Sequence, residues 1–189
     1  MGLGEVDKLK RDYDVNVRFA PYFLDPTTPP EGKPRAPQTQ PDDPPSYMEQ
    51  RALDSGIKIA RGRTWTSNSY LSLQAAEFAA DHPHEGDFHR AMFKAYFEDL
   101  ADIGKVETLL DVGKSVGLEE TAMADALESG EYRERVDEGI LWARSVGVTG
   151  VPTFIFEGQW GIVGAQDYPV FQGLMEKLGQ QPREPRLRK

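Results

Sequence analysis

The chain contains no cysteine. A protein without thiols forms no disulfide bond, has no thiolate metal ligand and has no cysteine nucleophile. No apolar run approaches the roughly 20 residues that a membrane-spanning helix requires. The first residues, MGLGEVDKLKRDYD, also lack the apolar segment of a secretory signal. The missing secretory signal predicts a cytoplasmic protein, and the missing apolar run predicts that it has no membrane partner.

Basic residues are scarce relative to acidic ones. The chain has 22 Lys and Arg against 31 Asp and Glu, a net charge of −9. Because nucleic-acid binders need clustered Lys and Arg for phosphate contacts, no nucleic-acid partner is expected. The apolar content, 39% with 10% aromatic residues, is that of a folded protein. A chain of 189 residues is expected to form one domain with room for an inserted subdomain.

The first 45 residues predict a helix, a strand and a long loop. Helical spacing of apolar residues favours a helix over 3–13, and alternation of apolar with polar residues favours a half-buried strand over 15–19. The segment from Pro26 to Pro45 then holds eight of the fourteen prolines. It predicts a proline-rich loop over 25–45, either an extended surface loop or a lid or partner-docking ribbon.

A series of helices follows. Ser46 and Glu49 have the spacing of a capping box at the start of the first. Residues 57–63 look extended, and helical periodicity resumes at about residue 67 and continues to residue 146. It includes one aromatic stripe that we expect to be largely buried: Phe88, Met92, Phe93, Tyr96 and Phe97. Because β-type patterns flank this block, residues 67–146 are predicted to form a helical subdomain inserted into a small α/β core. His82, His84 and His89 lack the spacing of a helical zinc site, so exposed loop and helix-start positions are favoured over a metal site.

The segment VTGVPTFIFEGQWGIVGAQ, residues 148–166, predicts a β-hairpin of 153–156 and 160–163 before a final helix. Pro152 opens the first strand and cannot donate to a strand ladder. From spacing alone it is either an ordinary trans proline or a cis proline that leaves the Val151 backbone free to pair with an extended ligand. Gly164, Ala165 and Gln166 either offer backbone N–H groups to an anion or are a plain helix start.

Three stretches together resemble one family. GVTGVPTFIF with the later GAQ, RFAPYFLDPTTPPEG and FKAYFEDLADI are similar to segments of DsbA-like thioredoxin-fold proteins of the FrnE-like branch. The resemblance covers about residues 3–178. It implies an α/β, thioredoxin-like fold with an inserted helical subdomain, in which Pro152 is the cis-proline beside the active site. The core is expected to comprise 1–66 and 147–179, followed by a disordered basic tail over 180–189.

The resemblance also implies a site and its partners. The expected substrate-binding residues are Val151, Pro152, Gly164, Ala165 and Gln166, and the expected partner is an extended polypeptide or thiol substrate. No metal and no cofactor are expected.

The departure from the family is the missing start of the domain. In that family a strand leads into a Cys-x-x-Cys motif at the start of the first helix, whereas this chain begins where the motif ends and has no cysteine. The fold is therefore expected to be N-terminally incomplete, as a fragment with a misplaced or engineered start, or as a natural cysteine-free relative. Either way, no residue is expected to be catalytic in this chain, because disulfide exchange requires an attacking thiolate.

Two other functions stay open. One is a glutathione-dependent isomerase or transferase of the kappa-like branch, which would make glutathione a further candidate partner. The other is a non-catalytic peptide-binding module that keeps the docking edge without the chemistry.

Overall fold

The computed structural model describes residues 2–183, and the chain divides into two compact units. One unit joins the two ends of the sequence, residues up to Ala20 and from Val146 onward, and the other is continuous from Pro21 to Ser145. Residues 21–66, which the sequence pattern assigns to the α/β core, thus group with the helices that follow them. The predicted basic tail over 180–189 lies outside the described residues from 184 on.

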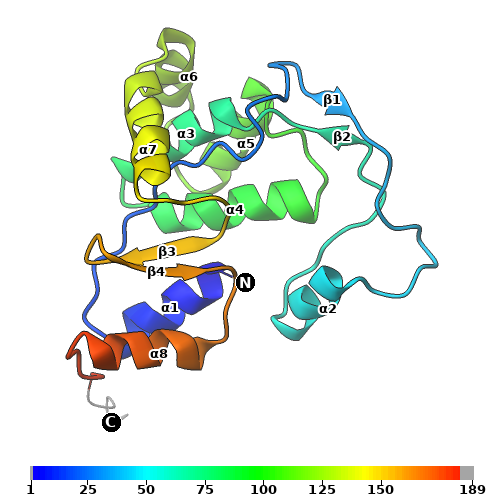
Figure 1. The fold of residues 1–189 in the computed structure, drawn as a ribbon. Helices are drawn as coiled ribbons and strands as arrows, with labels where there is room; N and C mark the ends of the chain where they lie inside the picture. The colour runs from blue at the N-terminus through cyan, green and yellow to red at the C-terminus, as the bar shows by residue number, and fades with distance from the viewer. Residues whose placement is uncertain (1, 184–189) are drawn as a thin grey trace, which may run out of the picture. The chain divides into compact units, whose positions relative to one another are not determined.

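The unit built from the chain ends consists of two helices and a hairpin: α1(Gly2–Asp12), β3(Thr153–Phe156), β4(Trp160–Val163) and α8(Tyr168–Lys177). The predicted hairpin is confirmed, with Thr153 opposite Val163 and Phe156 opposite Trp160. In Figure 1 both helices lie along the same side of the hairpin. Alternate side chains of the hairpin enter a core with the two helices, formed by Leu9, Tyr13, Ile162, Phe171 and Met175. The ring of Phe154 packs edge-on against that of Phe171, with 4.9 Å between centroids.

The predicted strand over 15–19 is wrong. Val15, Val17 and Phe19 are half-buried while Asn16 and Arg18 are exposed, so the alternation read from the sequence is present in the structure. A strand also needs a hydrogen-bonded neighbour. Among residues 2–183 the only strand pairs are β1 with β2 and β3 with β4. Residues 15–19 therefore add no strand to the β3–β4 hairpin.

The continuous unit contains the predicted helices. They are α3(Tyr70–Ala80), α4(Glu85–Phe97), α5(Val106–Ser115), α6(Glu120–Ser129) and α7(Arg133–Ser145), and no strand interrupts them. Their core is built around fully or almost fully buried side chains that include Phe78, Phe88, Leu109 and Met123. Among the described residues no helix is long and apolar enough to cross a membrane.

The aromatic stripe of α4 is only partly buried, contrary to expectation. Phe88 is fully buried and Met92 nearly so, but Phe93 is 48% exposed and Phe97 is 39% exposed. The core-facing row of α4 is completed by Ala95. Phe93 and Phe97, one turn apart, lie beside that row and stack on each other with 6.1 Å between ring centroids. Helical periodicity places residues on a face but does not say how wide the covered part of that face is.

A second two-stranded ribbon precedes the helices. It pairs β1(Lys33–Pro34) with β2(Trp65–Thr66), and α2(Tyr47–Asp54) lies in the long connection between them, apart from α3–α7 in Figure 1. Gly32, just before β1, has a φ of +84°. A β-carbon there would collide with Trp65 Nε1 and lie 2.7 Å from the carbonyl oxygen of Thr66. Glycine therefore permits the close approach of the two segments.

Candidate functional site

The start of helix α1 lies against Pro152. A β-carbon built on Gly2 would be 3.3 Å from Pro152 Cβ and 3.5 Å from Phe154 Cζ. The helix is held there from its inner face, where Val6 and Leu9 are buried. The sequence thus brings a helix N-terminus, a proline at a strand start and an exposed valine into one place, although they are some 150 residues apart in the chain.

The other end of α1 is tied to α8 and to the chain after it. Tyr168 donates to Asp12 Oδ2 at 2.8 Å, and Arg11 Nε lies 2.7 Å from Asp12 Oδ1. Hydrogen bonds from Arg11 and Tyr168 lower the pKa of the Asp12 carboxyl, whereas burial and Asp12 raise the pKa of Tyr168. The backbone N–H of Arg183 also donates to the Asp12 carbonyl oxygen, at 2.6 Å. These contacts fix the direction in which α1 points toward Pro152.

The Val151-Pro152 peptide bond is cis. The carbonyl oxygen of Pro152 accepts from the N–H of Gly164 at 2.8 Å, and Thr153 Oγ1 donates to the carbonyl oxygen of Gly150 at 2.7 Å. Val151 itself is 54% exposed, and its backbone has no hydrogen bond with any described residue. The residue before the proline is therefore held by its neighbours while its own N–H and C=O stay unpaired.

The edge of β3 that faces away from β4 begins next to Val151. The bond from Gly164 to Pro152 marks a hydrogen-bonded position of the antiparallel ladder. Such positions alternate with non-hydrogen-bonded pairs, here Thr153 with Val163 and Ile155 with Gly161. The N–H and C=O groups of Thr153 and Ile155 consequently point away from β4, and β3 has no second neighbouring strand among the described residues.

Gly164, Ala165 and Gln166 form the turn between β4 and α8. The N–H of Gln166 donates to the carbonyl oxygen of Gly164 at 2.9 Å, and its side-chain amide donates to the carbonyl oxygen of Val163 at 2.9 Å. Together with the bond from Gly164 to Pro152, two of the three N–H groups suggested for an anion are engaged inside the chain. The turn thereby supports the carbonyl of Pro152.

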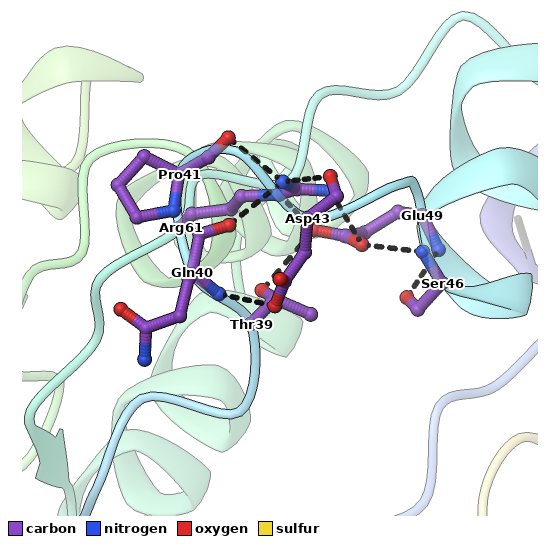
Figure 2. A network of polar contacts seen from close by, with 7 residues as sticks. All are labelled: Thr39, Gln40, Pro41, Asp43, Ser46, Glu49 and Arg61. Atoms are coloured by element: carbon purple, nitrogen blue, oxygen red, sulfur yellow. Dashed lines mark hydrogen bonds and ion pairs between the residues drawn. The ribbon is translucent and has the colours of Figure 1, made fainter.

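A polar network that the sequence pattern did not predict holds the proline-rich loop to α2 (Figure 2). The Arg61 side chain donates from Nε to Glu49 Oε1 at 2.7 Å and from Nη2 to Glu49 Oε2 at 3.2 Å. Its Nη1 donates to three loop carbonyl oxygens at 2.7 to 3.0 Å, those of Gln40, Pro41 and Asp43. The capping box is confirmed, because Glu49 also accepts from the N–H of Ser46. Hydrogen bonds from Arg61, and then from Ser46, lower the pKa of Glu49 to about 2, and burial opposes them with a smaller effect.

His82 and His89 are both half-buried. His82 Nδ1 lies 2.9 Å from the carbonyl oxygen of Phe78, and its ring lies 4.6 Å from that of Phe78 between centroids. Burial lowers the pKa of His89 to about 4. In the part of the chain that the structure describes, no group of three or more His, Asp or Glu side chains is arranged to hold a metal ion.

Comparisons with known proteins identify the family of the chain. A family model described as the DSBA-like thioredoxin domain matches residues 1–176. The uncharacterized protein YwbO of Bacillus subtilis is 26% identical over 182 residues, which cover 91% of this chain and 86% of that protein.

Two solved structures share the fold. A "probable DsbA oxidoreductase" of Streptomyces coelicolor has a TM-score of 0.64 and 22% identity, covering 75% of this chain and 61% of its own. A "putative protein disulfide isomerase" of Nitrosomonas europaea has a TM-score of 0.57 and 14% identity, covering 68% of each chain. The fold is thus the thioredoxin-like DsbA fold with a helical insert, and the chain belongs to the DSBA-like thioredoxin domain family.

Proposed function

We propose that this chain carries the polypeptide-docking edge of a DsbA-like, FrnE-type thiol-disulfide oxidoreductase, with Val151 and Pro152 as the central docking residues. The observation that carries the proposal is the unpaired, exposed Val151 beside the start of α1. An extended peptide that pairs with the Val151 backbone gains main-chain hydrogen bonds, as in other cases of strand addition. It would also pass the helix start, where the macrodipole favours a thiolate.

The chain by itself is proposed to bind without exchanging disulfides. Exchange proceeds when a thiolate attacks one sulfur of a disulfide, forms a new S–S bond and releases the other sulfur as a thiolate. This sequence has no sulfur nucleophile of that kind. A cysteine-free chain with this edge is a peptide-binding module.

The test introduces one thiol at two neighbouring places. In Gly2→Cys the new side chain faces Pro152, whereas a β-carbon on Gly4 meets nothing within 4 Å, so Gly4→Cys is the matched control in the same helical turn. Each variant is reacted with a mixed disulfide of an extended peptide and, separately, with a small aromatic disulfide. The ratio of the two rate constants removes differences in thiol reactivity.

A docking edge at Val151 predicts that this ratio is at least tenfold higher for Gly2→Cys than for Gly4→Cys. The advantage should disappear for a peptide whose backbone amides are N-methylated, because N-methylation removes the donors that would pair with the Val151 carbonyl. Equal ratios for the two variants, with both proteins folded, would refute the docking role.

A further inference from the structure

Helix α4 ends in a surface of three aromatic rings, and one arginine lies on it. The guanidinium carbon of Arg63 is 3.8 Å from the centroid of the Tyr96 ring, a cation–π contact. The ring of Tyr96 meets that of Phe97 edge-on, with 4.9 Å between centroids. The ring of Phe97 in turn stacks on that of Phe93, with 6.1 Å between centroids. These four side chains, which we call the α4 surface, therefore form an unbroken row of contacts with the cation at one end.

The backbone brings Arg63 to this end of the helix. The N–H of Ala60 donates to the carbonyl oxygen of Phe97 at 2.8 Å. This oxygen belongs to the last residue of α4, and the last four carbonyl groups of a helix have no partner within it. Gly62 follows with a φ of +87°, a conformation that glycine adopts without strain and that turns the chain ahead of Arg63. The arginine is thus positioned by its own backbone segment as well as by its ring contact.

Arg63 forms neither a hydrogen bond nor an ion pair with any described residue. Its Nη2 is buried without a partner, while Nε and Nη1 are not among the buried unpartnered atoms and so reach the surface. The nearby carboxylate of Asp102 accepts instead from the N–H of Gly104, at 3.1 Å. Arg61, two residues earlier, shows the opposite arrangement, because Glu49 and loop carbonyl oxygens engage its whole guanidinium. The charge of Arg63 is therefore available to a ligand, in a chain whose net charge is −9.

The phenylalanine rings of the α4 surface are exposed. Phe93 is 48% and Phe97 is 39% exposed, whereas Phe88 and Met92 on the core-facing row of the same helix are buried. A purely apolar molecule on the two exposed rings would leave the guanidinium without a counter-charge, and a simple anion would leave the rings uncovered. The ligand that fits this surface therefore carries both an apolar group and a negative charge.

We propose that the α4 surface binds a small organic carboxylate, which places its apolar or aromatic part on Phe93 and Phe97 and its carboxylate on Arg63. A hydrogen bond from a guanidinium to a carboxylate is charge-assisted and stronger than one between neutral groups. Aromatic rings gain further from edge-on or offset contacts with a ring of the ligand. A carboxylate also matches the single charge of Arg63, whereas a phosphate group carries about −1.5 to −2 at pH 7. All four residues lie within 21–145, so the proposal does not rest on the docking edge at Val151.

The test titrates the folded protein with three probes at constant ionic strength: phenylacetate, its neutral amide phenylacetamide, and acetate. The NMR signals of the Arg63 Nε–H group and of the Phe93 ring report the contact directly. Phenylacetate should shift both signals saturably. The amide lacks the charge and acetate lacks the ring, so each of them should bind at least tenfold more weakly than phenylacetate.

Variants separate the two halves of the surface. Arg63→Gln should weaken the binding of phenylacetate at least tenfold and abolish its advantage over the amide. Phe93→Ala, at an exposed side chain, should reduce the advantage of phenylacetate over acetate at least threefold. Arg144→Gln removes the same charge from an exposed arginine of α7 and should bind phenylacetate within twofold of the parent.

The comparison of the acid with the amide distinguishes a binding role of Arg63 from a structural one, which would lower stability without changing this ratio. If Arg63→Gln fails to fold, the same comparison in the parent and in Phe93→Ala decides. The proposal is overturned if phenylacetate shifts neither signal saturably, or if the parent binds the acid and the amide equally well. It is also overturned if folded Arg63→Gln binds phenylacetate as well as Arg144→Gln does.

Discussion

The two β-ribbons of this protein are stabilised in opposite ways. The β3–β4 hairpin lays alternate side chains on an apolar core, where Phe171 is fully buried beneath Phe154 and Phe156. The β1–β2 ribbon pairs only two residues on each strand. It depends on a glycine contact at Trp65 and on the hydrogen bonds of Arg61 farther along the connection.

The difference shows in what each ribbon leaves unpaired. The β3–β4 hairpin leaves backbone N–H and C=O groups of β3 unpaired on the side away from β4 among the described residues. Its stability comes from the apolar side chains on one face of the hairpin, not from hydrogen bonds at this edge. The β1–β2 ribbon and the residues after it leave side-chain donors unpaired, since Trp65 Nε1 and Ser67 Oγ are buried and have no hydrogen-bond partner among the described residues. The unpaired edge of β3 is of the kind to which an extended main chain can add.

The largest effect on the free energy of unfolding is expected from a substitution in the core of the β3–β4 hairpin. Phe171→Ala removes the ring against which Phe154 and Phe156 pack, and should lower the free energy of unfolding by about 3–5 kcal/mol. Urea denaturation followed by circular dichroism measures the change. Phe93→Ala, at an exposed phenylalanine, is the control and should change stability by about 0.5 kcal/mol or less. A small effect at Phe171 would mean that the hairpin does not depend on its apolar face.

A smaller effect is expected in the β1–β2 ribbon. Gly32→Ala puts a β-carbon into Trp65 at a φ of +84° and should cost about 2–4 kcal/mol through crowding and backbone strain. Gly56→Ala has a similar φ of +70° but open space around it, so it should cost only about 1–2 kcal/mol. Thermal unfolding of both variants separates the two contributions. Equal costs would show that the close contact with Trp65 does not matter.

The smallest effect is local and depends on pH. The pKa of Glu49 is lowered from 4.5 to about 2, so its ionised form stabilises the loop fully above pH 4.5, and this contribution is lost as the pH falls toward 2. Amide hydrogen exchange of residues 40–61, corrected for intrinsic rates, should show protection falling through this window. In Glu49→Gln protection should be weaker at neutral pH and flat between pH 4.5 and 2. A parent protein with flat protection would contradict the role of the ion pair.

Features fixed by local sequence were predictable, and features that depend on distant partners were not. The capping box at Ser46 and the hairpin around Glu157-Gly158 involve residues a few positions apart, and both are present. The β1–β2 pairing joins residues about 30 positions apart through strands of two residues, which leave no periodic signal. The partners of Arg61 are also distant in the sequence, 12 to 21 positions away, and leave no periodic signal.

The errors have the same origin. Residues 15–19 carry a strand's alternation but pair with no strand among residues 2–183. Phe93 has the hydrophobicity of a core residue but is 48% exposed. For the candidate site, the resemblance to DsbA-like proteins predicts Val151 and Pro152 as substrate-binding residues. The packing of Gly2 against Pro152 has no sequence signal, because only the three-dimensional fold brings the ends of the chain together.

The division of one unit between the chain ends has a consequence for biosynthesis. As the ribosome delivers the polypeptide, residues 21–145 emerge as an uninterrupted segment that can fold during translation. Helix α1 emerges earlier, yet Leu9 and Tyr13 share their core with residues of β4 and α8. Helix α1 must therefore wait, with its apolar face uncovered, until α8 has been made.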